Sequence, residues 1–461
     1  MTHTRIASTV VLAACATLLA APPSAAPLQD PPPQPPASQS TVRITITGSP
    51  GAPPKYAVPD FIPVSNDAET VAAAKMMGQV LWDDLNFERE FYLIPRDTYR
   101  TIPQPTSLDS VPLDRWKELN ADAVVAGSVQ RVGGDLVVRL RLIRVADGQS
   151  ALSKEYKGAA TNPRLFPHTI ADEIHLQQTG LVGVARSKIA FTSDRAGERM
   201  KGPVGDRGIA NVYYVDYDGA NEKRVSIQRT LELAPVWAPD GRTIAYTSYR
   251  TGFPDIVVQH LYEARQLATP AAGSRERHNF LPVWSPDGTR IAFTSNRDGN
   301  PEIYVVNRDG SGLRRLTSHP ENDVTPTWSP TGQQIAFTSN RGGNPNIWIM
   351  NADGSQPRRI TAESHADRAT WSPAPFNEIA YTARSGGGFD IKVYDFASNS
   401  SRTITDGIGS SEQPAFAPNG RHLAFTSTRA GKEQIFTIAR DGKDLRQVTR
   451  TGNNRYPNWS R

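Results

Sequence analysis

The chain has 461 residues and a formal net charge of +5, with 51 Lys and Arg against 46 Asp and Glu. This length predicts two or three domains. The basic residues are scattered through turns such as Asn296-Arg297 and Asn340-Arg341, whereas a nucleic-acid-binding protein carries a clustered basic face with stacking aromatic side chains. The charge pattern therefore argues against nucleic acid as a partner.

The first 26 residues have the pattern of a secretory signal. Arg5 precedes an apolar run over residues 6–20, and small residues follow as far as Ala26. The run is too short to span a membrane, so we predict a signal peptide over residues 1–26 that is cleaved after Ala26. The sequence before Cys15, the only cysteine, also matches a bacterial lipoprotein cleavage site, so acylation of Cys15 is the alternative. No later run is apolar for long enough to make the chain membrane-spanning.

A proline-rich segment and a short strand follow. Residues 22–36 contain eight prolines and cannot form a core, which predicts a disordered tether over residues 27–40. Residues 41–47 then alternate apolar and polar side chains, the period of a β-strand. Such a strand can pair with an edge of the next domain or add to the sheet of a partner. Its candidate partner-binding residues are Val42, Arg43, Ile44, Thr45 and Ile46.

Residues 41–180 are predicted to form a small α/β domain. Asn66, with Glu69 three residues later, resembles a capping box, and the apolar residues that follow share one helical face as far as Leu85. We expect a short helix at 116–119, a last helix that begins at residue 162 or 163, and strands at 92–94, 123–129, 136–145 and 150–157. His168 and His175 lie on the last helix, where we expect them to be solvated or half-buried.

The rest of the chain, residues 186–461, is built from one repeated unit. Residues 281–317 show it best, as four short apolar runs with turn signals at 286–288 (Pro-Asp-Gly) and 309–310 (Asp-Gly). Four-stranded sheets repeated at this period are typical of a β-propeller. The predicted fold class is mainly β, a six-bladed β-propeller preceded by a small α/β domain. One aromatic residue marks each copy, in steps of 43 to 47 residues: Trp237, Trp284, Trp328, Trp371, Phe416 and Trp459.

The phase of the repeat predicts how the ring closes. The series opens on a second strand, at residues 188–193, and ends on a first strand, at residues 456–460. Pairing of the C-terminal segment with the strand that contains Ile189 would complete one blade from both ends of the array and leave no bare sheet edge. We expect each marker aromatic residue to pack between neighbouring blades.

Several short sequence motifs, taken together with this domain order, resemble those of a known family. They are 122–127 (Asp-Ala-Val-Val-Ala-Gly), 284–288 (Trp-Ser-Pro-Asp-Gly), 291–295 (Ile-Ala-Phe-Thr-Ser), Val42-Arg43-Ile44, Thr179-Gly180-Leu181 and Arg277-His278-Asn279. Over residues 41–461 the chain resembles the TolB family, the periplasmic component of the Tol-Pal system of Gram-negative bacteria. The resemblance implies binding rather than chemistry.

The resemblance also implies a role and partners. A protein of this family bridges the cell envelope in support of outer-membrane integrity, cell division and protein transport. It docks the peptidoglycan-associated lipoprotein Pal on the propeller and the inner-membrane protein TolA through the N-terminal segment. Other outer-membrane or peptidoglycan-associated proteins are further partners that the resemblance allows. No cofactor is implied, and the chain itself is expected to be a monomer.

The channel of the propeller provides the candidate partner-binding site. The first strand of each blade lines the axial channel, so the loops that enter these strands converge on one mouth. This rim is mixed in charge, and Phe280 and Tyr456 are its aromatic anchors. Such a rim suits a protein or peptide, and a water-filled mouth is the alternative. The candidate residues are His278, Asn279, Phe280, Asp323, Val324, Thr325, Asp367, Arg368, Glu412, Gln413, Asn454 and Arg455.

An enzyme is the second interpretation of the same mouth. His278, Asp323, Asp367 and Glu412 are metal-ligand types, which would suit a periplasmic, lactonase-like, metal-dependent hydrolase. However, the sequence contains no close-spaced ligand pair such as His-x-x-x-His and no Gly-x-Ser-x-Gly nucleophile elbow. We therefore predict a binding protein with no catalytic residues, no metal and no cofactor.

Overall fold

The computed structural model describes residues 52–200, 207–227, 229–262, 266–267, 269–271 and 273–460, all within one compact unit, Ile46–Arg461. The predicted signal peptide, Cys15, the tether and the strand from Val42 to Ile46 lie outside the described residues. The predictions made for them stay predictions.

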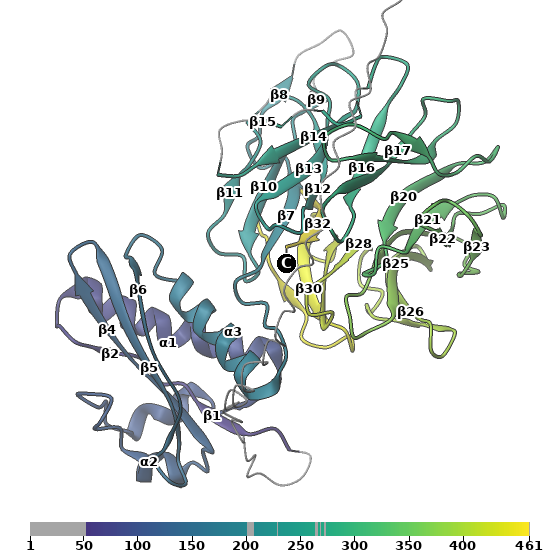
Figure 1. Cartoon of the computed structure of the whole chain (residues 1–461). Coiled ribbons are helices and arrows are strands. Elements are labelled where there is room, and N and C mark those ends of the chain that lie inside the picture. The colour runs from purple at the N-terminus through teal and green to yellow at the C-terminus, as the bar shows by residue number, and fades with distance from the viewer. Residues whose placement is uncertain are drawn as a thin grey trace, which may run out of the picture. The chain divides into compact units, whose positions relative to one another are not determined.

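The α/β domain is a mixed sheet with helices on both faces (Figure 1). Helices α1 (Ala68–Glu88) and α3 (Leu165–Thr179) pack on one face, whereas α2 (Leu113–Glu118) and the 3-10 helix η1 (Arg96–Thr101) pack on the other. The strands, in their order across the sheet, are β3 (Tyr92–Leu93), β1 (Lys55–Ala57), β4 (Ala123–Val132), β5 (Asp135–Arg144) and β6 (Ser150–Ala159), with β2 (Ile62–Pro63) beside β4.

Helix α1 begins one residue later than the sequence predicts. Its N-cap is Asp67, whose carboxylate accepts the backbone N–H of Thr70 at 2.9 Å. The predicted capping box on Asn66 and Glu69 does not form, since Asp67 takes the cap position, and Glu69 pairs with Arg131 of β4. An Asp satisfies an orphan N–H of the first turn as well as an Asn does, so the sequence offered two adjacent caps.

Six four-stranded antiparallel sheets form the propeller, as predicted. Blade 1 contains β7 (Lys188–Ser193), β10 (Asn211–Asp216), β11 (Lys223–Arg224) and β32 (Asn454–Trp459). Blade 2 contains β12 (Glu232–Trp237), β13 (Thr243–Ser248), β14 (Asp255–His260) and β15 (Gln266–Leu267), and blade 3 contains β16 (Asn279–Trp284), β17 (Arg290–Ser295), β18 (Glu302–Asn307) and β19 (Arg314–Arg315). Blade 4 contains β20 (Asp323–Trp328), β21 (Gln334–Ser339), β22 (Asn346–Asn351) and β23 (Arg358–Arg359). Blade 5 contains β24 (Ala366–Trp371), β25 (Glu378–Ser385), β26 (Gly388–Asp395) and β27 (Ser400–Thr403), and blade 6 contains β28 (Ser411–Phe416), β29 (His422–Ser427), β30 (Gln434–Ala439) and β31 (Arg446–Gln447). A two-stranded hairpin of β8 (Arg199–Met200) and β9 (Arg207–Gly208) lies outside these sheets.

The ring closes between the two ends of the repeat array. Trp459 of β32 lies opposite Ile189 of β7, and Asn454 lies opposite Ser193. Figure 1 shows the yellow β32 beside the teal β7. The pairing that the phase of the repeat predicts is therefore present, and it joins segments about 270 residues apart in the chain.

The marker aromatic residues pack between blades, as expected. Trp284 of blade 3, for example, lies in one buried cluster with Ala245 and Ile256 of blade 2. Trp328 of blade 4 likewise packs against Ile303 of blade 3. Since each blade shares its buried core with the next blade, removal of one marker aromatic side chain disturbs two sheets.

A bulge repeats at the third residue of every first strand. Each of these residues has φ between 51° and 59°, although none is a glycine. In five blades its N–H is donated to a threonine of the second strand in the preceding blade, as from Thr325 to Thr294 at 3.1 Å. The threonine of the Ile-Ala-Phe-Thr-Ser phrase thus holds neighbouring blades together. The six bulge residues are Ala234, Leu281, Thr325, Arg368, Gln413 and Tyr456.

Candidate docking site

The first strands of all six blades line the central channel, as predicted. A cavity of about 130 Å³ is bounded by the third, fourth and fifth residues of these strands. A second cavity of about 160 Å³ lies at the end of the strands where the marker aromatic residues are found. The bulge residues therefore surround the channel near the mouth at which the first strands begin.

Alignment on the paired strands corrects three of the predicted site residues by one position. Counted back from the marker aromatic, the first residue of β16 is Asn279, so His278 precedes the strand. In blades 5 and 6 the first residues are Ala366 and Ser411, so Asp367 and Glu412 are second residues. The six first residues are each at most 1% exposed: Glu232, Asn279, Asp323, Ala366, Ser411 and Asn454.

Three predicted site residues point into the blades and make structural contacts. Asn279 accepts a hydrogen bond from Nη2 of Arg297 at 2.7 Å, and Asn454 accepts one from the equivalent Arg195 at 2.7 Å. Asp323 forms the matching contact as an ion pair with Arg341. Each of these side chains binds an arginine of its own blade and is therefore not available to a partner.

The side chains of two bulge residues from the predicted set also form hydrogen bonds within the propeller. Oε1 of Gln413 accepts the N–H of Tyr456 at 2.7 Å and the hydroxyl of Thr426 at 2.9 Å. The hydroxyl of Thr325 lies 2.7 Å from that of Thr338. The side chain of Gln413 thus connects blade 6 to blade 1, whereas that of Thr325 bonds within blade 4.

Seven of the predicted residues do lie on the accessible rim. Arg368 is the most informative of them, because its guanidinium lies 4.8 Å from the ring centre of Tyr456 across the channel mouth. Asp367 faces His365 at 3.5 Å, and His278 has Nε2 3.0 Å from the carbonyl oxygen of Arg275. The accessible residues are His278, Phe280, Val324, Asp367, Arg368, Glu412 and Arg455.

Blade 5 adds a feature that the sequence analysis missed. Its strands β25 and β26 are eight residues long and continue past the first residue of β24, because Ala366 pairs with Ala383 and the hairpin ends at Ser385 and Gly388. The hairpin therefore extends on the same side as the mouth. Phe389 lies between Arg384, 5.8 Å from its ring centre, and His365, 5.4 Å away. The run of three glycines at 386–388 was the available signal.

Among the described residues, the acidic and histidine side chains of the mouth do not come together as a group of potential ligands. His278, Asp323, Asp367 and Glu412 each contact a different protein group, which for Glu412 is the hydroxyl of Ser410 at 2.8 Å. Within the described part of the chain, one group of three such side chains has ligand atoms close together. It is His168, Asp216 and Asp218, away from the mouth.

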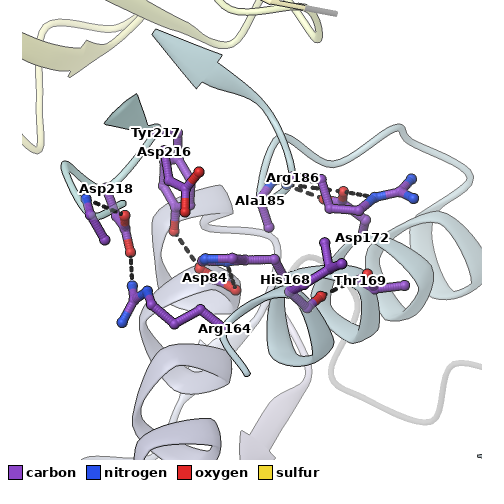
Figure 2. A network of polar contacts seen from close by, with 12 residues as sticks. Asp84, Arg164, His168, Thr169, Asp172, Ala185, Arg186, Asp216, Tyr217 and Asp218 are labelled. Carbon is purple, nitrogen blue, oxygen red and sulfur yellow. Dashed lines mark hydrogen bonds and ion pairs between the residues drawn. The ribbon is translucent and has the colours of Figure 1, made fainter. Parts of the chain in front are cut away.

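That group belongs to a buried polar junction between the α/β domain and blade 1. Asp84 of α1 is bonded through Oδ2 to Nδ1 of His168 of α3 at 2.8 Å. Its Oδ1 accepts the hydroxyl of Tyr217, which follows β10, at 2.6 Å. Figure 2 shows these groups facing one another, with Asp216 and Asp218 on either side of Tyr217 in the chain. His168 is 3% exposed, so its expected solvated or half-buried position is wrong.

A second part of the junction lies at the end of α1. The carboxylate of Glu88 accepts the N–H of Val184 at 2.8 Å and the side-chain amide of Asn419 at 3.0 Å. His422 stacks on Phe87 at 4.1 Å and donates Nε2–H to its carbonyl at 3.1 Å. Burial raises the pKa of Glu88 to about 8 and lowers the pKa of His422 to about 3.

The predicted position of His175 is wrong as well, since this residue is fully buried behind Glu88. Burial lowers its pKa, and Nδ1 lies 3.0 Å from the carbonyl oxygen of Leu181. The sequence did carry a signal for the junction. Asp84 and Glu88 follow Met77 and Leu81 by seven residues, on the apolar face of α1.

A closed six-bladed propeller, joined through buried polar contacts to a small α/β domain, defines a two-domain propeller protein. The family models agree with this class. The model of the TolB beta propeller domain matches residues 177–461, and that of the TolB amino-terminal domain matches residues 42–151. Since the first match alone covers more than half of the chain, the chain belongs to the TolB family.

Curated relatives carry the same family name. The Tol-Pal system protein TolB of Desulfosudis oleivorans is 34% identical over 211 residues, which cover 45% of this chain and 46% of the relative. That of Cereibacter sphaeroides is 34% identical over 235 residues, which cover 50% of each protein. The chain spans about half the length of the curated relatives it matches.

A solved structure supports the fold over nearly the whole chain. The crystal structure of TolB from Acinetobacter baumannii matches with a TM-score of 0.71 and 24% sequence identity, and it covers 90% of this chain and 98% of that one. In the part of the chain that the structure describes, we find no helix with the length and apolar character that crossing a membrane requires.

Proposed function

We propose that this chain is a periplasmic bridging protein of the Tol-Pal system, in support of outer-membrane integrity and cell division. In this proposal a Pal-like lipoprotein docks on the channel mouth of the propeller, and a TolA-like inner-membrane protein binds the N-terminal segment. Export by the predicted signal peptide would bring the chain to the periplasm. Membership of the TolB family supports the system, and the accessible rim supports the docking site.

The observation that best supports the proposed docking site is the contact between Arg368 and Tyr456 at the mouth. Arg368 has its guanidinium over an aromatic ring, and within the described residues it forms no ion pair. Arginine and tyrosine are enriched among the residues that carry most of the binding energy in interfaces, and such residues cluster near the interface centre. A stable partner would cover about 800 Å² of this face, and in this proposal the covered area extends to the hairpin of blade 5.

Capture of a purified Pal-like lipoprotein domain tests the docking site. Arg368→Ala and His278→Ala should each weaken capture about tenfold or more, because both side chains lie on the rim. Gln333→Ala is the matched control, since Gln333 is exposed in the turn between β20 and β21 at the opposite end of the blades. Equal capture by all three variants would contradict the proposal that the mouth is the docking surface.

The N-terminal segment is tested separately, because it lies outside the described residues. Deletion of residues 27–47 should abolish capture of a TolA-like domain. If the strand from Val42 to Ile46 competes between this chain and a partner, the same deletion should also change Pal affinity, since two ligands are coupled only through states that each prefers. Unchanged Pal affinity would count against coupling, and retained TolA capture would count against the site. Mass spectrometry of the mature N-terminus decides between cleavage after Ala26 and acylation of Cys15.

A further inference from the structure

The junction contains three potential metal ligands from two separate parts of the chain. A ring nitrogen of His168 and one carboxylate oxygen each from Asp216 and Asp218 lie within 4.8 Å of one another. His168 is carried by α3 of the α/β domain, whereas Asp216 ends β10 and Asp218 lies in the turn after it. Tetrahedral zinc with bonds of about 2.0–2.2 Å holds its ligand atoms about 3.3–3.6 Å apart. The three groups would therefore need to move inward by about 1 Å.

The imidazole of His168 is already oriented as a metal ligand. Nδ1 is held by Asp84 at 2.8 Å, and Asp84 is held in turn by the hydroxyl of Tyr217. A carboxylate on one ring nitrogen fixes the tautomer and leaves the other nitrogen for a metal. That other nitrogen, Nε2, is buried and makes no hydrogen bond to any described residue. An orphaned polar atom in a residue that is 97% buried requires a partner.

The two carboxylates are now neutralised by flexible basic side chains. Lys188 approaches Asp216 at 2.5 Å, and Arg164 pairs with Asp218, a contact that Figure 2 shows. The side chains of Lys188 and Arg164 are 30% and 26% exposed. Their charged groups can therefore turn outward to water while the stems stay packed. Both basic residues would then compete with a cation for the same oxygens.

We propose that His168, Asp216 and Asp218 bind one Zn²⁺ ion, with water as the fourth ligand, at the junction between the α/β domain and blade 1. One imidazole and two carboxylates suit zinc, whereas calcium and magnesium prefer sites made of oxygen alone. The ion would join α3 directly to the end of β10 and clamp the two parts of the chain together. It would be structural, since the site lies apart from the channel mouth.

Titration of the mature, untagged chain with Zn²⁺ alone tests the site by calorimetry and equilibrium dialysis. The expected result is one bound ion per chain and a higher melting temperature with Zn²⁺ than with Mg²⁺. Asp218→Asn should weaken binding about tenfold or more. This variant should keep its fold, because Asp218 lies at the surface. Asp84→Asn should cost about 10–100-fold, the usual effect of losing the carboxylate behind a ligating histidine.

The competing arginine gives the sharpest variant. Arg164→Gln should tighten Zn²⁺ binding. It removes the guanidinium that pairs with the carboxylate of Asp218, and it leaves all three proposed ligands in place. His278→Ala, at the channel mouth, is the control for a histidine outside the site and should bind as the parent does. The proposal is overturned if the parent binds no stoichiometric Zn²⁺, if Asp218→Asn binds as tightly as the parent, or if Arg164→Gln binds no more tightly.

Discussion

The side chain of Gln413 accepts the backbone N–H of Tyr456 at 2.7 Å, across the boundary between blade 6 and the completed blade 1. At the other five boundaries a threonine hydroxyl accepts the equivalent N–H directly, as Thr294 does for Thr325. Here Thr426 instead donates to Gln413 at 2.9 Å. The side chain of Gln413 thus lies between Thr426 and the N–H of Tyr456 at the boundary where the ring closes.

Gln413→Ala should destabilise the propeller, because it leaves the N–H of Tyr456 without its acceptor. An unsatisfied buried donor costs about 1–3 kcal/mol, which urea unfolding followed by tryptophan fluorescence can measure. The neighbouring Glu412→Ala is the matched control, since within the described residues the carboxylate of Glu412 has one hydrogen-bond partner, Ser410 on the rim. Equal free energies of unfolding for the two variants would contradict the structural role of Gln413.

Asp323→Ala and Asp323→Asn should differ strongly in stability. Removal of one partner of a buried ion pair leaves the other charge uncompensated and costs about 3–5 kcal/mol, and Arg341 is only 11% exposed. Asparagine already occupies the equivalent position at Asn279 and Asn454, where it accepts from the matching arginine. Thermal unfolding of the two variants checks this, and an alanine variant as stable as the asparagine variant would refute it. Loss of partner capture by Asp323→Ala would therefore report unfolding of blade 4.

Trp459→Ala should lower the free energy of unfolding more than Trp371→Ala does. Trp459 is 6% exposed and donates its indole N–H to Ser187 at 2.6 Å. Loss of a buried tryptophan costs about 3–5 kcal/mol, and here it also removes a contact that closes the ring. Trp371 is only half-buried, so its replacement should cost less. Guanidinium unfolding of both variants measures the difference, and a larger loss for Trp371→Ala would be the contrary result.

Glu88→Gln should change how stability depends on pH. Burial raises the pKa of Glu88 from 4.5 to about 8, so the folded chain holds a proton that the unfolded chain releases near pH 4.5. A raised pKa contributes stability that is complete below the ordinary value and is lost as pH rises through the folded value. The glutamine variant should therefore gain on the parent between pH 5 and pH 9.

Unfolding at several pH values measures this effect. His175, Arg421, Asp172 and Glu90 also face the Glu88 carboxyl, and all of them are kept in the variant. Glu155→Gln, on the exposed part of β6, controls for the loss of one negative charge. A constant difference between Glu88→Gln and the parent at every pH would show that Glu88 does not hold the proton.

The sequence predicted the features that the six copies share, because a repeated pattern averages out local irregularities. The blade count, the pairing of β32 with β7 and the interblade position of Trp284 all follow from spacing. Individual site residues were less predictable. Loops of variable length enter the first strands, so alignment by residue type shifted Asp367 and Glu412 by one position, and a one-residue shift turns a side chain to the other face of a strand.

The junction could not be predicted from one segment, because its partners come from distant parts of the chain. Asp84 and Tyr217 are 133 residues apart, and Glu88 and Asn419 are 331 residues apart. A charged residue on an apolar helical face indicates that a buried partner exists, but not which one. His168 and His175 were placed wrongly for the same reason, since helical position alone does not show what packs against a helix.

The pairing of β32 with β7 also sets an order of events during biosynthesis. β32 follows the strands of blades 2 to 6 in the chain, so it is synthesised after them. Without β32, blade 1 would have three strands, and β7 would keep unpaired N–H and C=O groups along one side. A chain that stops before β32 would therefore expose a sheet edge that could pair with another chain.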